Sequence, residues 1–570
     1  MKITLSLLIT CIILTSLAIN LWGIAHDMPY CYEHDEINFV TTALSFGKGN
    51  LNPVSFNHGS FLYYFLFLEY LVFYFIKLLA GSVKSGTDFL LYYINNPSIF
   101  FILGRVSAAL LASFSVFLAY LIGKKLVNSC CGILAAIFLA FSLLFVNMAH
   151  LIKEDIFYVF FLLLSFLCII NADRSKKLFY LAAFLIGVAV SCKYLAILGI
   201  IFVFTGFFTV QKRSFRSAAK EGILACVFMS AGFFLCQPFA FVHMVPFFRN
   251  ILELKGHIYD RPIGDHKSMI WYIYLIYLKK SMGLPLFIAS IASVLLVLRK
   301  DCLRINILVL PFVFIYFVFI SSGVNVQPNY LMAILPFIGI YTAVFIAKYI
   351  HAPAGKPQNL LVSFIIGFLL VSPSFINVLR YDYLLTMPDT RAVSKEWIES
   401  NIPQNSRILI EGAFPWEIVH NPPLLENKEC LKEELNEICD KGGKGILWEM
   451  RISQPDKKKS TKYFLKKEGF FNKYTTGTLS KYMPDYVVVS SYYDHGFWVS
   501  KNDRKIFYED LLKKYSLVKN FTAYPYIIWF PSFNTLRENP ENLRYVNLLS
   551  RNRELIAGPN VSIYQRKLPN

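Results

Sequence analysis

Residues 103–126 read LGRVSAALLASFSVFLAYLIGKKL, an almost unbroken apolar run that ends in a lysine pair and a leucine. A helix of about 20 apolar residues crosses a hydrocarbon core of about 30 Å, so the run predicts a membrane span, which we place at 99–122. Lys124 and Lys125 follow that span. Cytoplasmic loops carry an excess of Lys and Arg, so the stretch predicts both insertion and its direction.

The composition of the whole chain agrees with this reading. Its 570 residues are 56% hydrophobic and 16% aromatic, with a mean hydropathy of +0.49. A soluble globular protein of this length is less apolar. We therefore predict a polytopic α-helical membrane protein with about 11 spans, at roughly 3–24, 99–122, 131–147, 156–171, 178–191, 194–210, 222–241, 284–298, 305–320, 330–347 and 359–379.

Basic residues gather in alternate connections between these runs, around Lys124, Arg174, Lys212, Arg299 and Lys348. The positive-inside rule makes these connections cytoplasmic. The N-terminus is then expected on the cytoplasmic side of a plasma or inner membrane. The first long loop and the region after the last span are expected outside it.

One further apolar stretch, GSFLYYFLFLEYLVFYFIKLLAG at 59–81, is long enough to span but contains Glu69 and Lys77. If it spanned, every later loop would invert and the basic loops would face outward. We therefore expect an interfacial helix in the first outer loop, with its tyrosines at headgroup level.

The formal net charge of +19 does not indicate a nucleic-acid partner. The basic residues occupy loops and do not form a stripe with interleaved base-stacking aromatics. Membrane lipids are the expected partners of this charge distribution.

After the last span the chain alternates charged and apolar blocks. RAVSKEWIESNI (391–402) and FYEDLLKKY (507–515) have helical spacing, whereas RILIEG (407–412), YVVVSS (486–491) and VSIYQR (561–566) predict short strands. We expect a transmembrane module at 1–379 and an extracytoplasmic α/β domain at 380–570.

The first outer loop contains CYEHDEINFV, residues 31–40, where acids cluster just beyond the first apolar run. Acids contribute little to membrane orientation, so the cluster needs another cause. The chain has no phosphate-cradling Gly-rich loop, no HExxH and no GxSxG. Asp35 and Glu36, at the outer rim of a helix bundle, could act as a base on a nucleophile or hold a divalent cation on a phosphate.

Other ionisable residues fall at the same predicted face. Asp155, in AHLIKEDIFYVFF, precedes a span, although an ordinary solvated turn would explain it too. Lys193, in SCKYLAIL, joins two apolar runs and could equally be a snorkelling anchor. Together with His58, Lys153 and Arg261, Lys193 could meet the charge of a phosphate.

The order and spacing of the early DE pair, NHGSFLYY, LGRVSAALLASFSVFLAYLIGKKL, AHLIKEDIFYVFFLLLSF and GVAVSCKYLAIL resemble the C-type membrane glycosyltransferases. The similar branch contains protein O-mannosyltransferases and bacterial aminoarabinose transferases, which use polyprenyl-phosphate-linked sugars. The resemblance covers about residues 1–350. The tail PDTRAVSKEWIESNIPQNSRILIEG is also similar to the outer domains of prokaryotic members.

The resemblance implies that Asp35 is the catalytic base and Glu36 its supporting partner. It implies that Asp155 helps to bind a metal or substrate, with Asp35 and Asp155 as candidate ligands of a divalent cation, and that Lys193 is the basic residue of the KY turn. The chain departs from many relatives at QPNYLMAILP, where Asn329 stands in place of an arginine. The WWDYG-type motif of oligosaccharyltransferases is missing, which disfavours transfer to a sequon asparagine.

We therefore predict transfer of a sugar from a polyprenyl-phosphate donor to a hydroxyl or amine of a protein, lipid or glycan at the outer face. The alternative from another class is a transporter or flippase of a lipid-linked or anionic substrate. A transporter would need acids within its spans or broken helices near the midplane, whereas the spans predicted here are nearly free of acids. A membrane-anchored binding protein would need only one or two spans.

Overall fold

The computed structural model describes residues 2–53, 55–210, 215–259, 270–323, 326–350 and 359–411, and, further on, 422–426, 429–430, 432, 435–436, 462–468, 477–490, 501–522 and 560–567.

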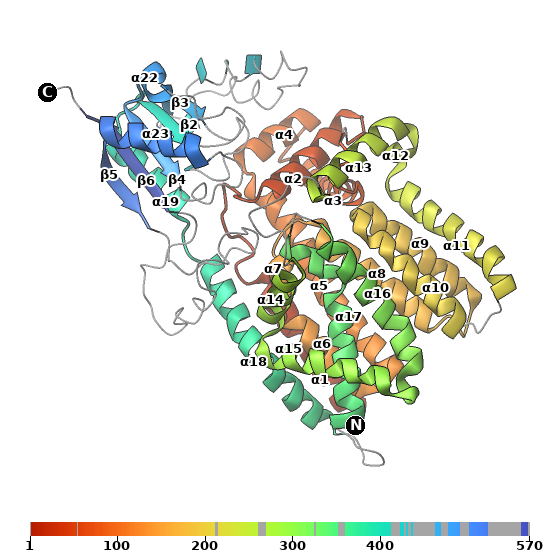
Figure 1. Cartoon of the computed structure of the whole chain (residues 1–570). Helices are drawn as coiled ribbons and strands as arrows, with labels where there is room; N and C mark the ends of the chain where they lie inside the picture. Colours follow the sequence, from red (N-terminus) through yellow and green to blue (C-terminus); the bar gives the residue numbers. More distant parts are fainter. Residues whose placement is uncertain are drawn as a thin grey trace.

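A bundle of helices forms the first two thirds of the chain (Figure 1). Short 3-10 turns of the bundle are labelled η2–η5, and one π-helical turn is labelled η6. The elements of the bundle are α1 (Lys2–Leu21), α5 (Ser98–Leu126), α6 (Ser129–Ala140), α7 (Leu143–Ala149), α8 (Glu154–Ile170), α9 (Lys176–Cys192), η2 (Tyr194–Gly199), α10 (Ile200–Thr209), α11 (Phe215–Cys236), α14 (Ile270–Met282), α15 (Leu284–Ser293), η3 (Val294–Leu298), η4 (Lys300–Cys302), α16 (Leu303–Ser321), η5 (Pro328–Ala333), α17 (Leu335–Phe345), η6 (Ile346–Ile350) and α18 (Leu360–Leu385).

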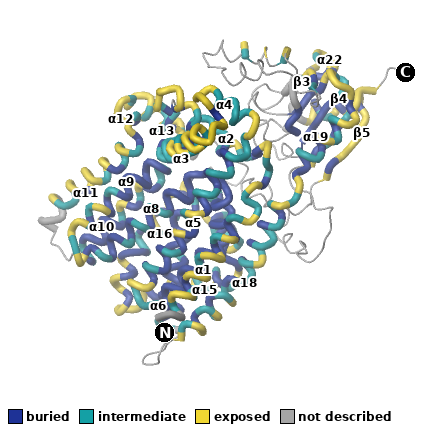
Figure 2. Tube along the Cα trace, turned by 180° about the vertical axis from the view of Figure 1, so that it is seen from behind, coloured by how far each residue is buried: buried dark blue, intermediate teal, exposed yellow. Residues whose placement is uncertain are grey.

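A second group of helices gathers at the end of the bundle opposite the N-terminus, which we call the outer end (Figure 1). It comprises α2 (His34–Ser45), the 3-10 turn η1 (Phe46–Lys48), α3 (Phe61–Leu79), α4 (Gly86–Asn95), α12 (Pro238–Val242) and α13 (Met244–Tyr259). The interior of the bundle is buried, whereas α12 and α13 are largely exposed (Figure 2).

Among the described helices, four are long and apolar enough to cross a membrane, and two bent pairs would raise the number to six. The prediction of a polytopic helical membrane protein is confirmed, but the number of eleven spans is not. Helix α3 passes the same test of length and composition. Its placement in the outer interface therefore stays a prediction.

Two of the predicted spans belong to bent helix pairs. The run at 131–147 divides into α6 and α7, at an angle of 63°, and the run at 284–298 is one limb of a pair bent by 119°. Hydropathy does not detect such a break in backbone direction, so neither bend could be predicted from the sequence. Gly283 marks the second break with a φ of 77°, a conformation that favours glycine.

Three buried serines join the bent pairs to α18. The hydroxyls of Ser142 and Ser281 lie 2.7 Å apart, and the Ser374 hydroxyl donates to the carbonyls of Phe141 and Ser281, each at 2.7 Å. A break in a helix frees backbone carbonyls that lipid cannot satisfy. Side-chain hydroxyls supply the missing donors here.

Helices α9 and α11 pack backbone against backbone. A Cβ atom added at Gly187 would lie 1.9 Å from the Met229 carbonyl oxygen, and one at Gly232 would lie 2.1 Å from that of Phe184. Small residues allow this close approach between membrane helices. The glycines therefore fix how α11 attaches to the bundle.

The C-terminal part contains a six-stranded sheet with the order β2-β3-β1-β4-β6-β5. Strands β2, β3, β1 and β4 are parallel, whereas β6 runs antiparallel to β4 and β5. Its elements are α19 (Thr390–Asn401), β1 (Arg407–Glu411), β2 (Leu425–Glu426), β3 (Lys462–Glu468), α22 (Thr478–Tyr482), β4 (Tyr486–Ser490), α23 (Lys501–Lys514), β5 (Tyr515–Phe521) and β6 (Val561–Arg566).

Alternate side chains of β4 fill two separate cores. Val488 packs with Ile398 of α19 on one face of the sheet, and Val487 packs with Leu511 of α23 on the other. The predicted small α/β region is confirmed, and α19, β1, β4, α23 and β6 correspond to the predicted helices and strands. Strands β2, β3 and β5 and helix α22 were not predicted. Helix α18 continues past the predicted boundary at 379 to Leu385, so the division into two domains stays a prediction.

Replacing Ser374 by alanine should destabilise the bundle, because the carbonyls of Phe141 and Ser281 lose a buried donor. We expect a loss of about 1–2 kcal/mol, seen as a lower thermal midpoint of the purified protein in detergent. Ser372→Ala is the control, since that hydroxyl bonds only to Leu369 of its own helix on an exposed face. Equal midpoints for the two variants would contradict the role of the serine cluster.

Candidate active site

The acidic motif of the first outer loop begins helix α2. Glu33 precedes the helix in an extended conformation, and Asp35 and Glu36 occupy its first turn. Carboxylates are favoured there by the exposed N–H groups and by the helix dipole. Successive residues of a helix point in different directions, so the two acids face different surroundings.

Glu36 points into the bundle and pairs with Arg105 of α5. Arg105 donates from Nε to Oε1 at 2.8 Å and from Nη2 to Oε2 at 2.6 Å, and the Ile152 N–H donates to Oε1 at 2.8 Å. Neither side chain of the ion pair is exposed. Glu36 is therefore held in a buried ion pair, and its predicted role beside Asp35 stays a prediction.

Asp35 points the other way, toward Lys153 at the N-terminal end of α8. The Lys153 Nζ lies 3.1 Å from Oδ2 of Asp35 and 2.8 Å from Oε1 of Glu33. The side chain of Asp35 is 32% exposed, against 13% for Glu33. Burial alone would raise the pKa of Asp35, but Lys153 first and His58 second hold that pKa well below its ordinary value. Asp35 is therefore an accessible, ionised carboxylate.

Lys193 lies at the C-terminal end of α9 and faces two further acids. Its Nζ is 2.7 Å from Oδ1 of Asp155 and 3.8 Å from Oε1 of Glu154. Asn329 donates to the second oxygen of Asp155 at 3.3 Å. Asp155 thus contacts the residue that replaces the arginine of many relatives, and its side chain is only 1% exposed.

His58 completes the cluster from the loop before α3. Its Nδ1 lies 3.3 Å from Oε1 of Glu154, and the imidazole is 27% exposed. Burial lowers the pKa of His58, but Glu154, with a contribution from Asp35, raises it above its ordinary value. The structure therefore brings together the predicted residues Asp35, Lys153, Asp155, Lys193 and His58.

Glycine and three polar side chains hold the His58 loop in place. A Cβ atom at Gly59 would lie 2.2 Å from the Ser191 carbonyl oxygen, so only glycine lets the loop pass against α9. The Tyr194 hydroxyl donates to the carbonyls of Phe56 and His58 at 2.9 and 3.2 Å.

Two residues from further along the chain support the same loop. Gln237 accepts from the Ser60 N–H at 3.1 Å and donates to the Tyr194 hydroxyl at 3.0 Å, and Asn250 accepts from the Phe56 N–H at 2.9 Å. Polar side chains of this kind carry no motif that sequence reasoning could have used.

Sequence reasoning also missed Arg105 and Glu154. Arg105 interrupts an apolar run, and an arginine inside a predicted span is a signal that could have marked it. Glu154 was passed over beside Asp155. Arg261 lies outside the described residues, so its predicted contact with phosphate stays a prediction.

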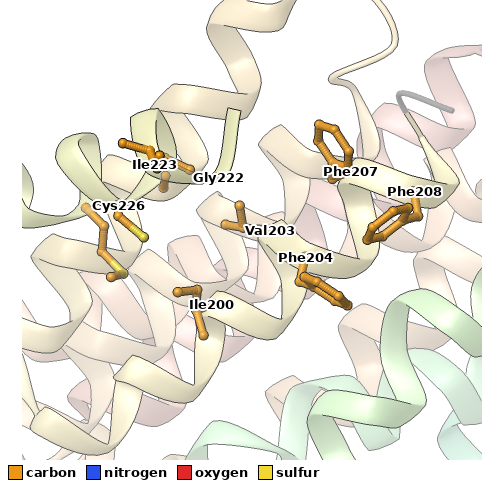
Figure 3. A pocket seen from close by; sticks show the side chains of 11 residues that line it. Ile200, Val203, Phe204, Phe207, Phe208, Gly222, Ile223 and Cys226 are labelled. Carbon is orange, nitrogen blue, oxygen red and sulfur yellow. The ribbon is translucent and has the colours of Figure 1, made fainter. Parts of the chain in front are cut away.

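An apolar cavity of about 380 Å³ lies away from this cluster, between α9, α10 and α11 (Figure 3). Phe204, Phe207 and Phe208 of α10 face Ile223 and Cys226 of α11 across it. Its lining is apolar except for the Cys226 thiol and contains none of the charged residues of the cluster. The candidate active site is therefore the charged cluster.

Comparison with known families agrees with the resemblance predicted from the sequence. Residues 98–239 match the family model described as dolichyl-phosphate-mannose-protein mannosyltransferase, which confirms that resemblance over this segment. The segment includes Arg105, Lys153, Asp155 and Lys193, whereas Asp35 precedes it. No curated protein matches the sequence.

Several solved structures are similar. ArnT from Cupriavidus metallidurans bound to undecaprenyl phosphate is 11% identical, covers 89% of this chain and 95% of its own, and has a TM-score of 0.47. The oligosaccharyltransferase AglB from Archaeoglobus fulgidus, with an inhibitory peptide and a dolichol-phosphate, is 11% identical over 90% and 73% of the two chains, with a TM-score of 0.44. The A. fulgidus oligosaccharyltransferase in complex with Zn and sulfate is 11% identical over 97% and 88%, with a TM-score of 0.44.

Replacing Glu36 by glutamine should destabilise the protein strongly, because the Arg105 guanidinium is left buried without a counter-charge. Breaking such a pair costs about 3–5 kcal/mol, measurable as a fall in the thermal midpoint in detergent. Glu69→Gln is the matched control, since Glu69 accepts from the neutral Ser107 hydroxyl at 2.8 Å.

The double variant Glu36→Leu/Arg105→Met should recover much of the loss, because no uncompensated charge remains. A loss for Glu36→Gln no larger than that for Glu69→Gln would show that the ion pair does not stabilise this end of the bundle.

Proposed function

We propose that this chain is an integral membrane glycosyltransferase. It moves a sugar from a polyprenyl-phosphate donor to a hydroxyl or amine acceptor at the outer end of the helix bundle. The family match over residues 98–239 supports the class of reaction. The N-terminus is then cytoplasmic and the C-terminal α/β region extracytoplasmic, which the distribution of basic loops supports.

The observation that carries the proposal is the exposure of Asp35. Its side chain is 32% exposed, whereas those of Glu33, Glu154 and Asp155 are 13%, 10% and 1% exposed, and that of Glu36 is fully buried. Among these acids Asp35 is the one most open to an incoming acceptor. It also lies at the end of the bundle where a lipid-linked donor and a water-soluble acceptor can meet.

Asp35 acts as the general base. The acceptor oxygen or nitrogen attacks the anomeric carbon while its proton moves to a carboxylate oxygen of Asp35. The bond between that carbon and the phosphate oxygen breaks, and its electron pair leaves with the lipid phosphate. Because the pKa of Asp35 is low, the proton moves only as the attack makes the acceptor group more acidic. Attack from the face opposite the phosphate inverts the anomeric centre.

Cationic groups around Asp35 stabilise the leaving phosphate. Lys193 and His58 lie beside the acids Asp155 and Glu154, and a phosphate would compete with these carboxylates for them. Lys153 contacts Asp35 directly, so it keeps the base ionised as well as adding positive charge. Arg261, which lies outside the described residues, is proposed as a further phosphate contact.

A divalent cation at Asp35 and Asp155 fits these contacts poorly. Lys153 contacts Asp35, while Lys193 and Asn329 contact Asp155, so a cation would have to displace both ammonium groups. Within the part of the chain that the structure describes, no group of three His, Cys, Asp or Glu side chains is arranged to hold a metal. The mechanism proposed here routes no step through a metal ion.

Asp35→Asn should abolish transfer, because asparagine keeps the shape of aspartate but cannot accept a proton at neutral pH. We expect turnover to fall by about 10²–10⁴-fold. Mass spectrometry of lipid-linked sugars and glycans from cells lacking the protein, and from cells restored with either form, tests this. The donor should accumulate and one glycan residue should be missing both without the protein and with Asp35→Asn.

Asp88→Asn, on α4 at the same outer end, is the control and should restore the glycan fully. An unchanged pool of lipid-linked sugars in cells lacking the protein would rule out the proposed reaction. A normal glycan with Asp35→Asn would rule out the base.

Phosphate binding should weaken as pH rises through the raised pKa of His58, because the imidazolium then loses its charge. Below that pKa the charge is present and binding is strongest. With undecaprenyl phosphate as the probe, we expect about a tenfold loss of affinity across this range in nanodiscs, and His58→Gln should remove that dependence.

His243→Gln, at the end of α12, should keep the pH dependence of the wild type. Identical pH profiles for wild type and His58→Gln would exclude His58 from the phosphate site.

A further inference from the structure

The backbone that leads into α2 is strained and must be held by its surroundings. Asp27 and Cys31 have φ values of 64° and 51°, in the left-handed region that non-glycine residues seldom occupy. Such conformations persist when neighbouring contacts determine them. The position of Asp35 therefore depends on the contacts that hold residues 24–33.

One set of these contacts comes from within the bundle. Arg105, besides pairing with Glu36, donates from Nη1 to the carbonyls of Ile24 and His26 at 3.0 and 2.9 Å. These hydrogen bonds hold the backbone at Ile24 and His26, and the ion pair with Glu36 holds the first turn of α2. Cys31 is buried against the same ion pair, because its thiol donates to Oε2 of Glu36 at 3.4 Å. Tyr30 and Tyr32 instead meet cationic side chains of the C-terminal α/β region.

The second set of contacts comes from the C-terminal α/β region. The Arg391 guanidinium, in the first turn of α19, lies 3.6 Å from the centre of the Tyr32 ring. Both side chains are buried, at 4% exposure each. A desolvated cation over an aromatic face is a stronger contact than the same pair in water.

Arg391 is itself held in orientation. Its Nε and Nη2 donate to the two oxygens of Asp389, each at 2.7 Å, so the guanidinium plane cannot turn freely. Helix α19 is in turn anchored on the sheet, where Ile398 is buried and Trp397 contacts Phe521. The contact therefore connects the sheet to the loop of Asp35 through buried groups at every step.

We propose that Arg391 is a positioning residue for Asp35, acting through the ring of Tyr32 three residues before it. The inference rests on the proposed function of Asp35 as a base. The C-terminal α/β region thus sets the geometry of the loop that carries Asp35. The hydroxyl of Tyr32 has no hydrogen-bond partner among the described residues, so Tyr32 meets Arg391 through its ring face.

The test compares Tyr32→Leu, which removes the ring face, with the conservative Tyr32→Phe, which keeps it. Arg391→Lys keeps the charge but loses the planar guanidinium and its paired bonds to Asp389. Turnover is followed as the release of polyprenyl phosphate from total lipid-linked sugars extracted from the membranes. Binding is measured with undecaprenyl phosphate, and hydrogen exchange is measured on the peptide 27–40.

Tyr32→Leu and Arg391→Lys should each lower kcat by about 10- to 100-fold, since small displacements of reacting groups have effects of this size. Affinity for undecaprenyl phosphate should stay within about threefold, because Lys193 and His58 are untouched. Hydrogen exchange in 27–40 should become faster. Tyr32→Phe should match the wild type, and the double variant Tyr32→Leu/Arg391→Lys should be no worse than either single variant.

Unchanged exchange in 27–40 for both Tyr32→Leu and Arg391→Lys would overturn the inference, whatever the activity. Faster exchange with normal kcat would overturn it too, since the loop would then move without affecting the reaction. These results are separate from a failure of the proposed function, which would appear as normal turnover of Asp35→Asn with the contact to Arg391 intact.

Discussion

The paired hydrogen bonds between Arg105 and Glu36, at 2.8 and 2.6 Å, join the first outer loop to the second long helix of the bundle. The same carboxylate accepts from the Ile152 N–H, just before the helix that carries Asp155. Two buried charges are stable only when each satisfies the other and their remaining bonds are made. The position of Asp35 follows, because it occupies the same helical turn as Glu36.

Around this pair the outer end of the bundle balances acids against bases. Lys153 faces Asp35, and Lys193 faces Asp155, each at hydrogen-bonding distance. Lys153 keeps the pKa of Asp35 below its ordinary value, although burial alone would raise it. In the proposed reaction, the donor phosphate would enter by exchange, taking over a lysine from a carboxylate. Each of these lysines thus keeps a carboxylate partner until a phosphate replaces that carboxylate.

The sequence by itself determined the class of the protein and the order of its parts. Apolar runs, the loop acids and the alternating pattern of the last 190 residues are local properties, and hydropathy and periodicity report local properties well. Asp35, Lys193 and His58 could be predicted as a group at one face because the basic loops assign each connection to a side of the membrane. The resemblance to a known family supplied the roles that are proposed for Asp35 and Lys193.

Tertiary structure decided which groups meet. Arg105 lies 69 positions from Glu36, and Arg391 lies far from Tyr32 in the sequence, so no local pattern could pair them. The break at Gly283 was hidden as well, because a bent helix pair and a straight span have the same hydropathy. Contacts between distant segments depend on how helices pack, and packing is decided by the whole buried surface rather than by any one stretch of chain.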